Sequence, residues 1–243
     1  RAYVDAGDLL ATDQSIQIEE SLSGRKTVSI RGGNADDVLV LYNGFRLNRP
    51  YDNVFDLSLI DMQNIEQVEI VKGGHSVLYG SDAFSGVINI VPKNTKDKNL
   101  KISQQLGSYD SGFWNVNGQL KVKKSFISLN QKRGSYKRIF QDSQIESPGL
   151  NSVLSHSAFD MTNRLKNSLI NGNLEWNLTQ DKQTFENTRD QNTINSTNQL
   201  AGVRYDGVIW FLGEVEIALA SHNLSESQDL NNQRGYINRS LNH

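Results

Sequence analysis

The chain contains no cysteine among its 243 residues. A disulfide scaffold, a thiol nucleophile and a cysteine-ligated zinc site are therefore excluded. Neither sign of charge prevails, because 25 Lys and Arg residues oppose 27 Asp and Glu residues. A protein that binds nucleic acid through a strongly basic surface is therefore not expected.

Long hydrophobic runs are also missing. The longest, such as Val38–Tyr42 and Val208–Leu212, are five residues long, whereas a transmembrane helix needs about 20 consecutive apolar residues. A transmembrane β-strand needs only about 9–11 residues with lipid-facing side chains at alternate positions. The sequence therefore excludes a membrane-spanning helix and leaves a membrane-spanning barrel open. The chain begins at Arg1 without a signal peptide, so we expect a piece of a longer protein.

The first 95 or so residues predict a small mixed α/β unit. Asn43-Gly44 follows an apolar run and predicts a hairpin, because a type I′ turn needs positive φ at both central residues. Asp56–Asn64 predicts a short helix with Leu57 and Ile60 on one face, and Ala6–Leu10 predicts the end of another. Strands are predicted where β-branched residues cluster between turns, at Thr27–Arg31, Val38–Tyr42, Val68–Lys72 and Gly86–Val91.

After Pro92 the pattern changes to long alternations of apolar and polar residues. In Gly112–Val122 the even positions are apolar or glycine and the odd positions from Asn115 to Lys121 are polar, which predicts a strand with two unlike faces. Similar strands are predicted at Leu100–Leu106, Ser168–Leu178 and Val208–Ala220. The polar segment Ser135–Asn167, which contains Pro148, predicts an extended loop between two strands.

Two β architectures fit these alternating strands. A soluble sandwich buries its apolar face, and its strands usually have about 5–6 residues. A porin-like barrel turns its apolar face to lipid and its polar face to a wet lumen, and its strands are longer. Trp114, Trp176 and Trp210 suit a membrane-interface belt in a barrel and a core in a sandwich. The pattern alone leaves both open.

Five short blocks then follow one another in the first half of the chain. They are, in order, Ser29–Gly32, Val38–Gly44, Ile65–Gly73, Leu78–Ala83 and Gly86–Ile90. In this order they resemble the plug domain of a TonB-dependent outer-membrane receptor, over roughly Asp5 to Lys93. The alternating strands beyond resemble the start of the barrel that surrounds such a plug. The blocks are more similar to receptors for vitamins and siderophores than to glycan importers.

The resemblance implies an α+β plug domain over residues 1–95, followed over residues 96–243 by part of a transmembrane antiparallel β-barrel. Barrels of this family have about 22 strands. The residues after Lys96 suffice for roughly seven, at about twenty residues for each strand and its connection. We therefore expect that the start of the plug and the later barrel strands are missing from this sequence.

The resemblance also implies import without catalysis. A receptor of this kind lies in the outer membrane of a Gram-negative bacterium and binds a scarce small molecule or metal chelate, such as an iron siderophore or a cobalamin. TonB, with its inner-membrane energising complex, then pulls on the plug through the missing N-terminal segment. The expected partners are TonB, the ligand and outer-membrane lipid. No enzyme activity, cofactor or nucleic acid is expected.

Two loops of the plug are candidates for ligand binding. Glu20–Lys26 and Leu47–Val54 lie where loops of the family reach the extracellular vestibule. Arginine binds carboxylate or phosphate through two parallel hydrogen bonds, and tyrosine offers a flat amphipathic surface. Solvated turns would contain similar residue types, so that alternative stays open. The residues expected to contact ligand are Ser23, Arg25, Arg49, Tyr51, Asp52 and Asn53.

Charged residues inside the matched blocks are expected to hold the plug in the barrel by pairing with charges on the barrel wall. Each exposed pair contributes only ~0–1 kcal/mol, which suits a domain that must be released. An ordinary polar strand face is the alternative. The residues expected to form this plug–barrel lock are Arg31, Glu66, Glu69 and Lys72.

Metal binding is not expected, because the four histidines are scattered along the sequence. Asp142, Glu146 and Asp160 could surround Ca²⁺ in the long polar segment, although a solvated loop is the simpler interpretation. Three other functions are alternatives to import of a vitamin or siderophore: a glycan-importing receptor of the same fold, a surface β-sandwich that binds without transport, and a secreted hydrolase. The hydrolase needs a catalytic triad or carboxylates about 5–10 Å apart, and no spacing in the sequence indicates either.

Overall fold

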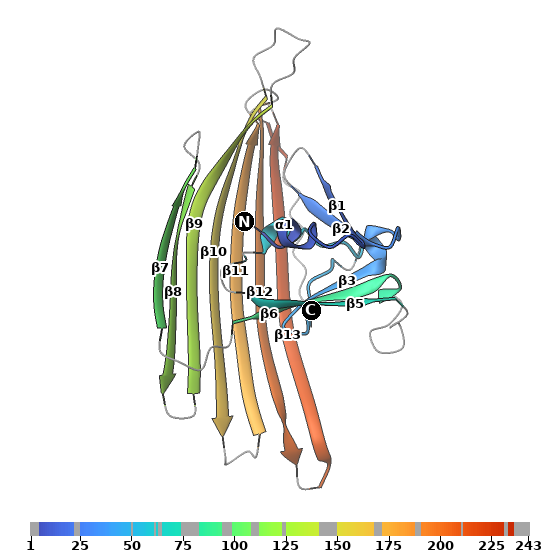
Figure 1. Ribbon diagram of the computed structural model, residues 1–243, viewed down its shortest axis with the longest axis vertical. Coiled ribbons are helices and arrows are strands. Elements are labelled where there is room, and N and C mark those ends of the chain that lie inside the picture. The colour runs from blue at the N-terminus through green and yellow to red at the C-terminus, as the bar shows by residue number, and fades with distance from the viewer. Residues whose placement is uncertain are drawn as a thin grey trace. The chain divides into compact units, whose positions relative to one another are not determined.

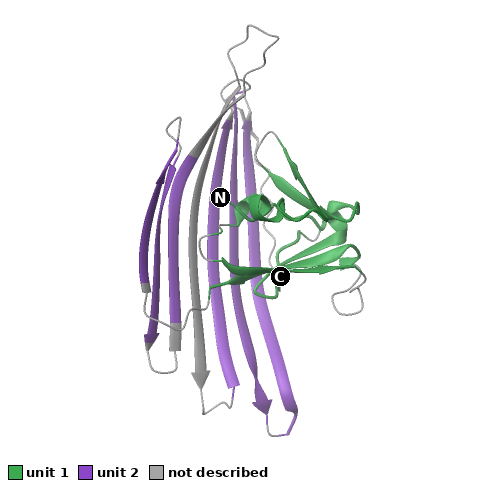
Figure 2. Cartoon of the chain, viewed as in Figure 1, with its two compact units in different colours: residues 1–94 green, residues 95–243 purple. Residues whose placement is uncertain are grey.

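The chain forms two compact units, residues 1–94 and residues 95–243, called unit 1 and unit 2 (Figure 2). The computed structural model describes residues 5–21, 25–49, 51–60, 62, 65–73, 83–93, 99–107, 112–122, 125–140, 150–167, 172–187, 191–209, 211–230 and 233–235.

Unit 1 is an α+β unit with two small sheets. The first is an antiparallel pair, and the second has the strand order β4-β3-β6-β5, with β3 and β6 parallel at its centre. Within the described residues, no helix is long and apolar enough to cross a membrane. The elements are α1 (Ala6–Leu10), β1 (Ile16–Glu20), β2 (Lys26–Ile30), η1 (Ala35–Asp37), β3 (Val38–Tyr42), β4 (Phe45–Arg46), η2 (Leu57–Leu59), β5 (Ile65–Lys72) and β6 (Gly86–Pro92).

The core of unit 1 lies around the central strands β3 and β6. All five residues of β3 are buried, as expected for a central strand that is covered on both faces. Ile88 and Ile90 of β6 have no exposed surface. The predicted hairpin between β3 and β4 is confirmed, because Asn43 and Gly44 have φ angles of 51° and 80°.

The predicted helix over Asp56–Asn64 is wrong in extent. Leu57–Leu59 form the 3₁₀ turn η2, which ends before Ile60, whose backbone is extended with φ −113° and ψ 116°. Asp56 caps this turn by accepting a hydrogen bond from the Ser58 amide. Leu57 and Ile60 are buried as predicted, but one turn is enough to bury them. The predicted helical residues at Ala6–Leu10 are confirmed as α1.

Unit 2 is an antiparallel meander of eight strands, each paired with its neighbours in the sequence (Figure 1). Strands β9 to β13 contain 16 to 18 residues each, about three times the usual length in globular proteins. The strands are β7 (Asn99–Leu106), β8 (Gly112–Val122), β9 (Ser125–Phe140), β10 (Leu150–Asn167), β11 (Gly172–Asn187), β12 (Asn192–Ile209), β13 (Gly213–Leu230) and β14 (Gln233–Gly235).

The two faces of unit 2 invert the burial pattern of a water-soluble sheet. On β8, Asn115 and Asn117 are 2% and 6% exposed, whereas Trp114, which precedes Asn115, is 39% exposed. On β11, Asn177 is 2% exposed and Leu178 is 41% exposed. Apolar side chains therefore point outward and polar side chains inward, as in a barrel wall that faces lipid.

The inward face is polar but not uniformly so. Asn115 donates a hydrogen bond from Nδ2 to Asn130 Oδ1 at 2.9 Å, and His222 Nε2 lies 2.7 Å from Asn198 Oδ1. Such lateral contacts satisfy amide and imidazole groups on the buried side of the sheet. A few apolar side chains share this face, namely Phe113, Phe185, Leu200 and Leu224.

Two predictions for the second half of the chain are wrong. Val208–Ala220 is not one strand, because the chain turns between β12 and β13, where the Leu212 amide donates to Ile209 O at 2.9 Å. Ser135–Asn167 is not an extended loop, because β9 continues to Phe140 and β10 begins at Leu150. Trp210, Asp142, Glu146 and the side chain of Asp160 lie outside the described residues.

Candidate functional site

The loop that follows β4 is anchored to β3 by Asn48, which is 1% exposed. Its Oδ1 accepts a hydrogen bond from the Val40 amide at 2.6 Å. Its Nδ2 donates to Val38 O at 2.8 Å and to Asn53 O at 2.6 Å. One buried side chain thus fixes both ends of the loop to a central strand. Asparagine is common in turns, so its residue type alone does not distinguish Asn48 from the other turn residues.

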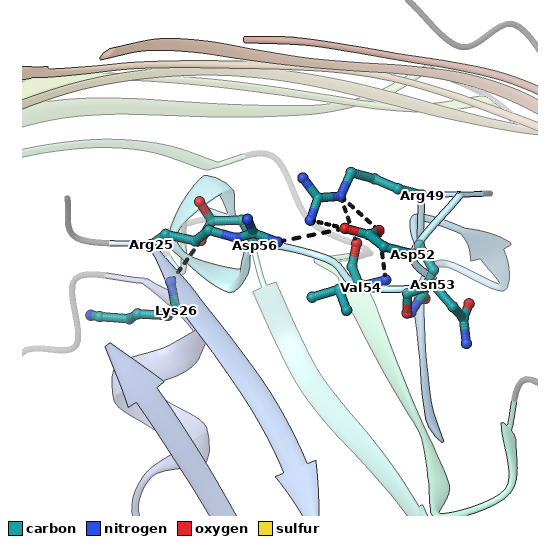
Figure 3. Close-up of polar contacts among 8 residues, drawn as sticks. Arg25, Lys26, Arg49, Asp52, Asn53, Val54 and Asp56 are labelled. Atoms are coloured by element: carbon teal, nitrogen blue, oxygen red, sulfur yellow. Dashed lines mark hydrogen bonds and ion pairs between the residues drawn. The ribbon is translucent and has the colours of Figure 1, made fainter. Parts of the chain in front are cut away.

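Arg49 and Asp52 form the polar centre of this loop (Figure 3). Arg49 donates from Nε to Asp52 Oδ1 at 3.0 Å and from Nη2 to Oδ2 at 2.5 Å. Its Nε also donates to Val54 O at 3.1 Å. A two-pronged contact of this kind fixes the guanidinium plane. Arg49 is therefore held in place before any ligand arrives.

Arg25, from the loop between β1 and β2, reaches the same carboxylate. Its Nη2 lies 4.0 Å from Asp52 Oδ2, and both side chains are about one-third exposed, at 34% and 33%. The structure thus brings together the two predicted loops, whose arginines are 24 positions apart in the sequence. The Arg25 Nε is buried and has no hydrogen-bond partner. Two guanidinium groups share the Asp52 carboxylate, and the Asp56 carboxyl also interacts electrostatically with Arg25.

Tyr51 is the exposed member of the cluster, at 48%. The Arg49 guanidinium carbon lies 5.1 Å from the centre of its ring, within the range of a cation–π contact. Asn53 is bound differently: its backbone is left-handed, with φ 50°, and its Oδ1 accepts from Arg46 Nη2 at 2.7 Å. Its Nδ2 donates to Asp36 O. Asn53 therefore shapes the loop, and Ser23 lies outside the described residues.

Lys26, the neighbour of Arg25, turns into the interior. Its Nζ donates to Asp5 Oδ2 at 2.7 Å and to Asp8 Oδ1 at 2.6 Å, and the residue is 3% exposed. Burial opposes its charge, but the two carboxylates outweigh burial and hold the pKa of Lys26 above its ordinary value. A Cβ at Gly7 would lie 2.6 Å from Lys26 Cδ, so this approach requires glycine.

Asp56 joins β2 to the turn η2. Its Oδ1 accepts hydrogen bonds from the Lys26 amide at 2.9 Å, the Ser58 amide at 3.0 Å and Ser58 Oγ at 2.7 Å. Burial raises the pKa of Asp56 above its ordinary value, and these bonds offset only part of the effect. Asp56 thus holds the backbone beside Arg25 in position.

The four residues predicted to lock the plug lie on the sheets and turns of unit 1. Lys72 Nζ pairs with Asp13 at 2.9 Å inside the unit, and Glu69 accepts hydrogen bonds from Gln67 and Asn89. Glu66 is exposed at a β-bulge of β5. Arg31 is exposed and has a left-handed backbone, with φ 52°. Pairing of these four residues with a barrel wall stays a prediction.

The comparisons with known proteins agree with this geometry. Residues 1–87 match the family of TonB-dependent receptor plug domains. This match identifies residues 1–87 as a plug domain of the TonB-dependent receptor type. TonB-dependent receptors are outer-membrane proteins of Gram-negative bacteria, and the fold of this chain is a plug domain followed by antiparallel β-strands.

The proteins similar to this chain are named for different transported substances. A vitamin B12 transporter, BtuB, of Vibrio cholerae serotype O1 is 35% identical over 107 residues, which cover 42% of this chain and 17% of that protein. The copper transporter OprC has a TM-score of 0.73 at 14% identity, covering 93% of this chain and 36% of the other. A ferric enterobactin receptor, PfeA, from Pseudomonas aeruginosa has a TM-score of 0.68 at 15% identity, covering 92% and 39%. The matched part is well under two thirds of each of these proteins.

Proposed function

We propose that this receptor imports a scarce small nutrient across the outer membrane in a TonB-dependent manner. The observation that carries the proposal is a plug-type unit followed directly in the chain by long strands with an outward apolar face. The matched proteins are named as transporters and receptors for a vitamin, a metal ion and an iron chelate. Neither a glycan importer nor a non-transporting sandwich is favoured by these findings.

We assign the ligand to the class of anionic metal chelates or cobalamin-like molecules. The cluster of Arg25, Arg49 and Asp52 has two cations for one carboxylate, and Tyr51 adds an exposed aromatic face. Arg25 is the group that a ligand would recruit, because its 4.0 Å contact with Asp52 is longer than a hydrogen bond. Ser23 and Asn53 complete the proposed ligand-binding loops.

TonB is the proposed energising partner, and Arg31, Glu66, Glu69 and Lys72 are the proposed lock between plug and barrel. Import of this kind breaks no bond in the ligand, so the chain needs no catalytic group. Weak, exposed ion pairs would hold the plug at rest and still allow its release. A ligand that recruits Arg25 would loosen the link between the two plug loops, which supports a role for this link in signalling occupancy.

The test is uptake by the full-length receptor in cells that lack other receptors for the offered ligands. Labelled cobalamin, ferric siderophores and oligosaccharides are offered to cells with and without TonB. We expect uptake of a cobalamin or a chelate that disappears without TonB and falls at least tenfold in Arg25→Gln. Lys121→Gln, which removes a cation from unit 2, is the matched control and should retain uptake. TonB-independent uptake, or uptake of oligosaccharides alone, would refute the proposal.

A further inference from the structure

The outward face of unit 2 is apolar over only part of the strand length. The exposed apolar side chains form what we call the apolar band: Leu120, Leu129, Leu178, Val203 and Leu219. Cross-strand pairing aligns its members, since Val203 pairs with Trp176 on one side and with Leu219 on the other. The band therefore runs across neighbouring strands at one level, as a lipid-facing belt does.

The band ends abruptly along β11, β12 and β13. On β11 the outward positions after Leu178 are Gln180, Lys182, Thr184 and Glu186. On β12 and β13 the outward positions at the same levels are polar as well, because Gln199 pairs with both Gln180 and Asn223. The level of Gln180 is therefore the boundary between the apolar band and a polar continuation of the wall.

Two cations project outward just past this boundary. Arg133 of β9 and Lys182 of β11 are both exposed, and both pair with Ser157 of the intervening strand β10. Two strand spacings separate them, or about 10 Å. Their sequence neighbours Lys132 and Asp181 are 1% and 4% exposed and face inward, which confirms the outward direction of the pair.

Among the side chains that the structure describes, no carboxylate pairs with Arg133 or Lys182, which we call the outer cationic pair. Among the described side chains, the nearest outward positions on their own strands are Gln131, Ser135, Gln180 and Thr184. Neither cation forms an ion pair with a described side chain. On the other side of Arg133, its cross-strand partner Trp114 is 39% exposed, and a tryptophan with one apolar and one polar edge suits a membrane interface.

We propose that the outer cationic pair binds the phosphate groups of an anionic outer-membrane lipid whose acyl chains lie along the apolar band. Arg133 can hold a phosphate through two parallel hydrogen bonds, and Lys182 adds a flexible point charge. Both side chains can lay their methylene stems against apolar surface while the charge stays at headgroup level. The charge, the spacing and the adjoining band together fit a headgroup with more than one phosphate. This site is separate from the ligand-binding loops and goes beyond import.

Native mass spectrometry of the full-length receptor tests the proposal, with lipid A as the probe. The receptor in detergent is mixed with lipid A that carries both phosphates or with lipid A from which both were removed. We expect the Arg133→Gln, Lys182→Gln double variant to retain roughly tenfold less of the phosphorylated lipid, because it loses two charge-assisted contacts. The charge-conserving Arg133→Lys, Lys182→Arg variant should retain it.

The matched control is Lys101→Gln, Lys121→Gln, which removes two exposed cations from inward positions of the same sheet. Equal retention by the wild type and the glutamine variant would overturn the proposal. So would an equal loss in the control, or equal retention of both forms of lipid A by the wild type. Correct folding is checked by electrophoretic mobility with and without heating. Ligand uptake is measured separately, so failure of import and failure of lipid binding are distinguishable.

Discussion

Replacing Trp176 with arginine is a direct test of which face of unit 2 meets lipid. Trp176 lies between Leu174 and Leu178 on its strand and pairs with Val203 across the sheet. It is thus well inside the apolar band. An arginine near the midplane of a membrane barrel costs about 2–4 kcal/mol, which corresponds to a shift of roughly 30- to 700-fold in the folding equilibrium.

The control is Asn173→Arg, which places the same charge at an inward position of the same strand. We expect little change there, because the polar face does not meet lipid. The assay is urea unfolding of the full-length receptor in phospholipid vesicles, followed by its electrophoretic mobility without heating. Equal destabilisation by the two variants would refute the assignment of faces, and so would a Trp176→Arg receptor as stable as the wild type.

Two further predictions concern unit 1 and use hydrogen exchange of the full-length receptor as the readout. Asp56→Ala removes three hydrogen bonds and should lower local stability around β2 and η2 by about 2–4 kcal/mol, whereas Asp56→Asn keeps the Oδ1 acceptor and should cost less than half as much. An equal loss of local stability in Asp56→Ala and Asp56→Asn would contradict the hydrogen bonds assigned to Asp56 Oδ1. Hydrogen bonding to Lys72 lowers the pKa of Asp13 below its ordinary value; the stabilisation is therefore present at neutral pH and is lost as the pH falls below about 4. Lys72→Met should weaken that acid sensitivity and leave the part that is due to the hydrogen bonds from Ser15, and an unchanged pH profile would contradict the pairing.

Much of unit 1 could be predicted because its local signals agree with its fold. The run Val38–Tyr42 is a buried central strand, and Asn43-Gly44 adopts the positive φ angles that its residue types favour. The helix over Asp56–Asn64 was overpredicted, since apolar residues at helical spacing are also buried by a single turn that Asp56 caps. Periodicity alone cannot tell one turn from several.

In unit 2 the faces could be predicted and some of the strand ends could not. The turn after Ile209 contains the apolar residues Phe211 and Leu212, and the only local signal is Gly213, with φ 80°. The alternation continues in phase through this turn, so two strands looked like one. The part of β9 beyond Gly134 was predicted as a loop, because apolar and polar residues do not alternate in its sequence, Ser135–Phe140.

The candidate site could likewise be predicted from the sequence only in part. Both loops could be recognised from their arginine, tyrosine and turn residues. Their convergence on Asp52 could not, because it depends on how β2 and β3 are placed in unit 1. The three hydrogen bonds of Asn48 and the inward turn of Lys26 beside the outward Arg25 depend on tertiary packing that no local pattern encodes.

The attachment of α1 has a mechanical consequence. The helix is one and a half turns long, and a single ammonium group ties two carboxylates at its start to β2. A contact of 2.7 Å ceases to be a hydrogen bond after about 1 Å of displacement, and a buried charge without its partner is strongly unfavourable. The attachment of α1 to β2 would therefore resist a small displacement of the helix strongly and a displacement larger than about 1 Å only weakly.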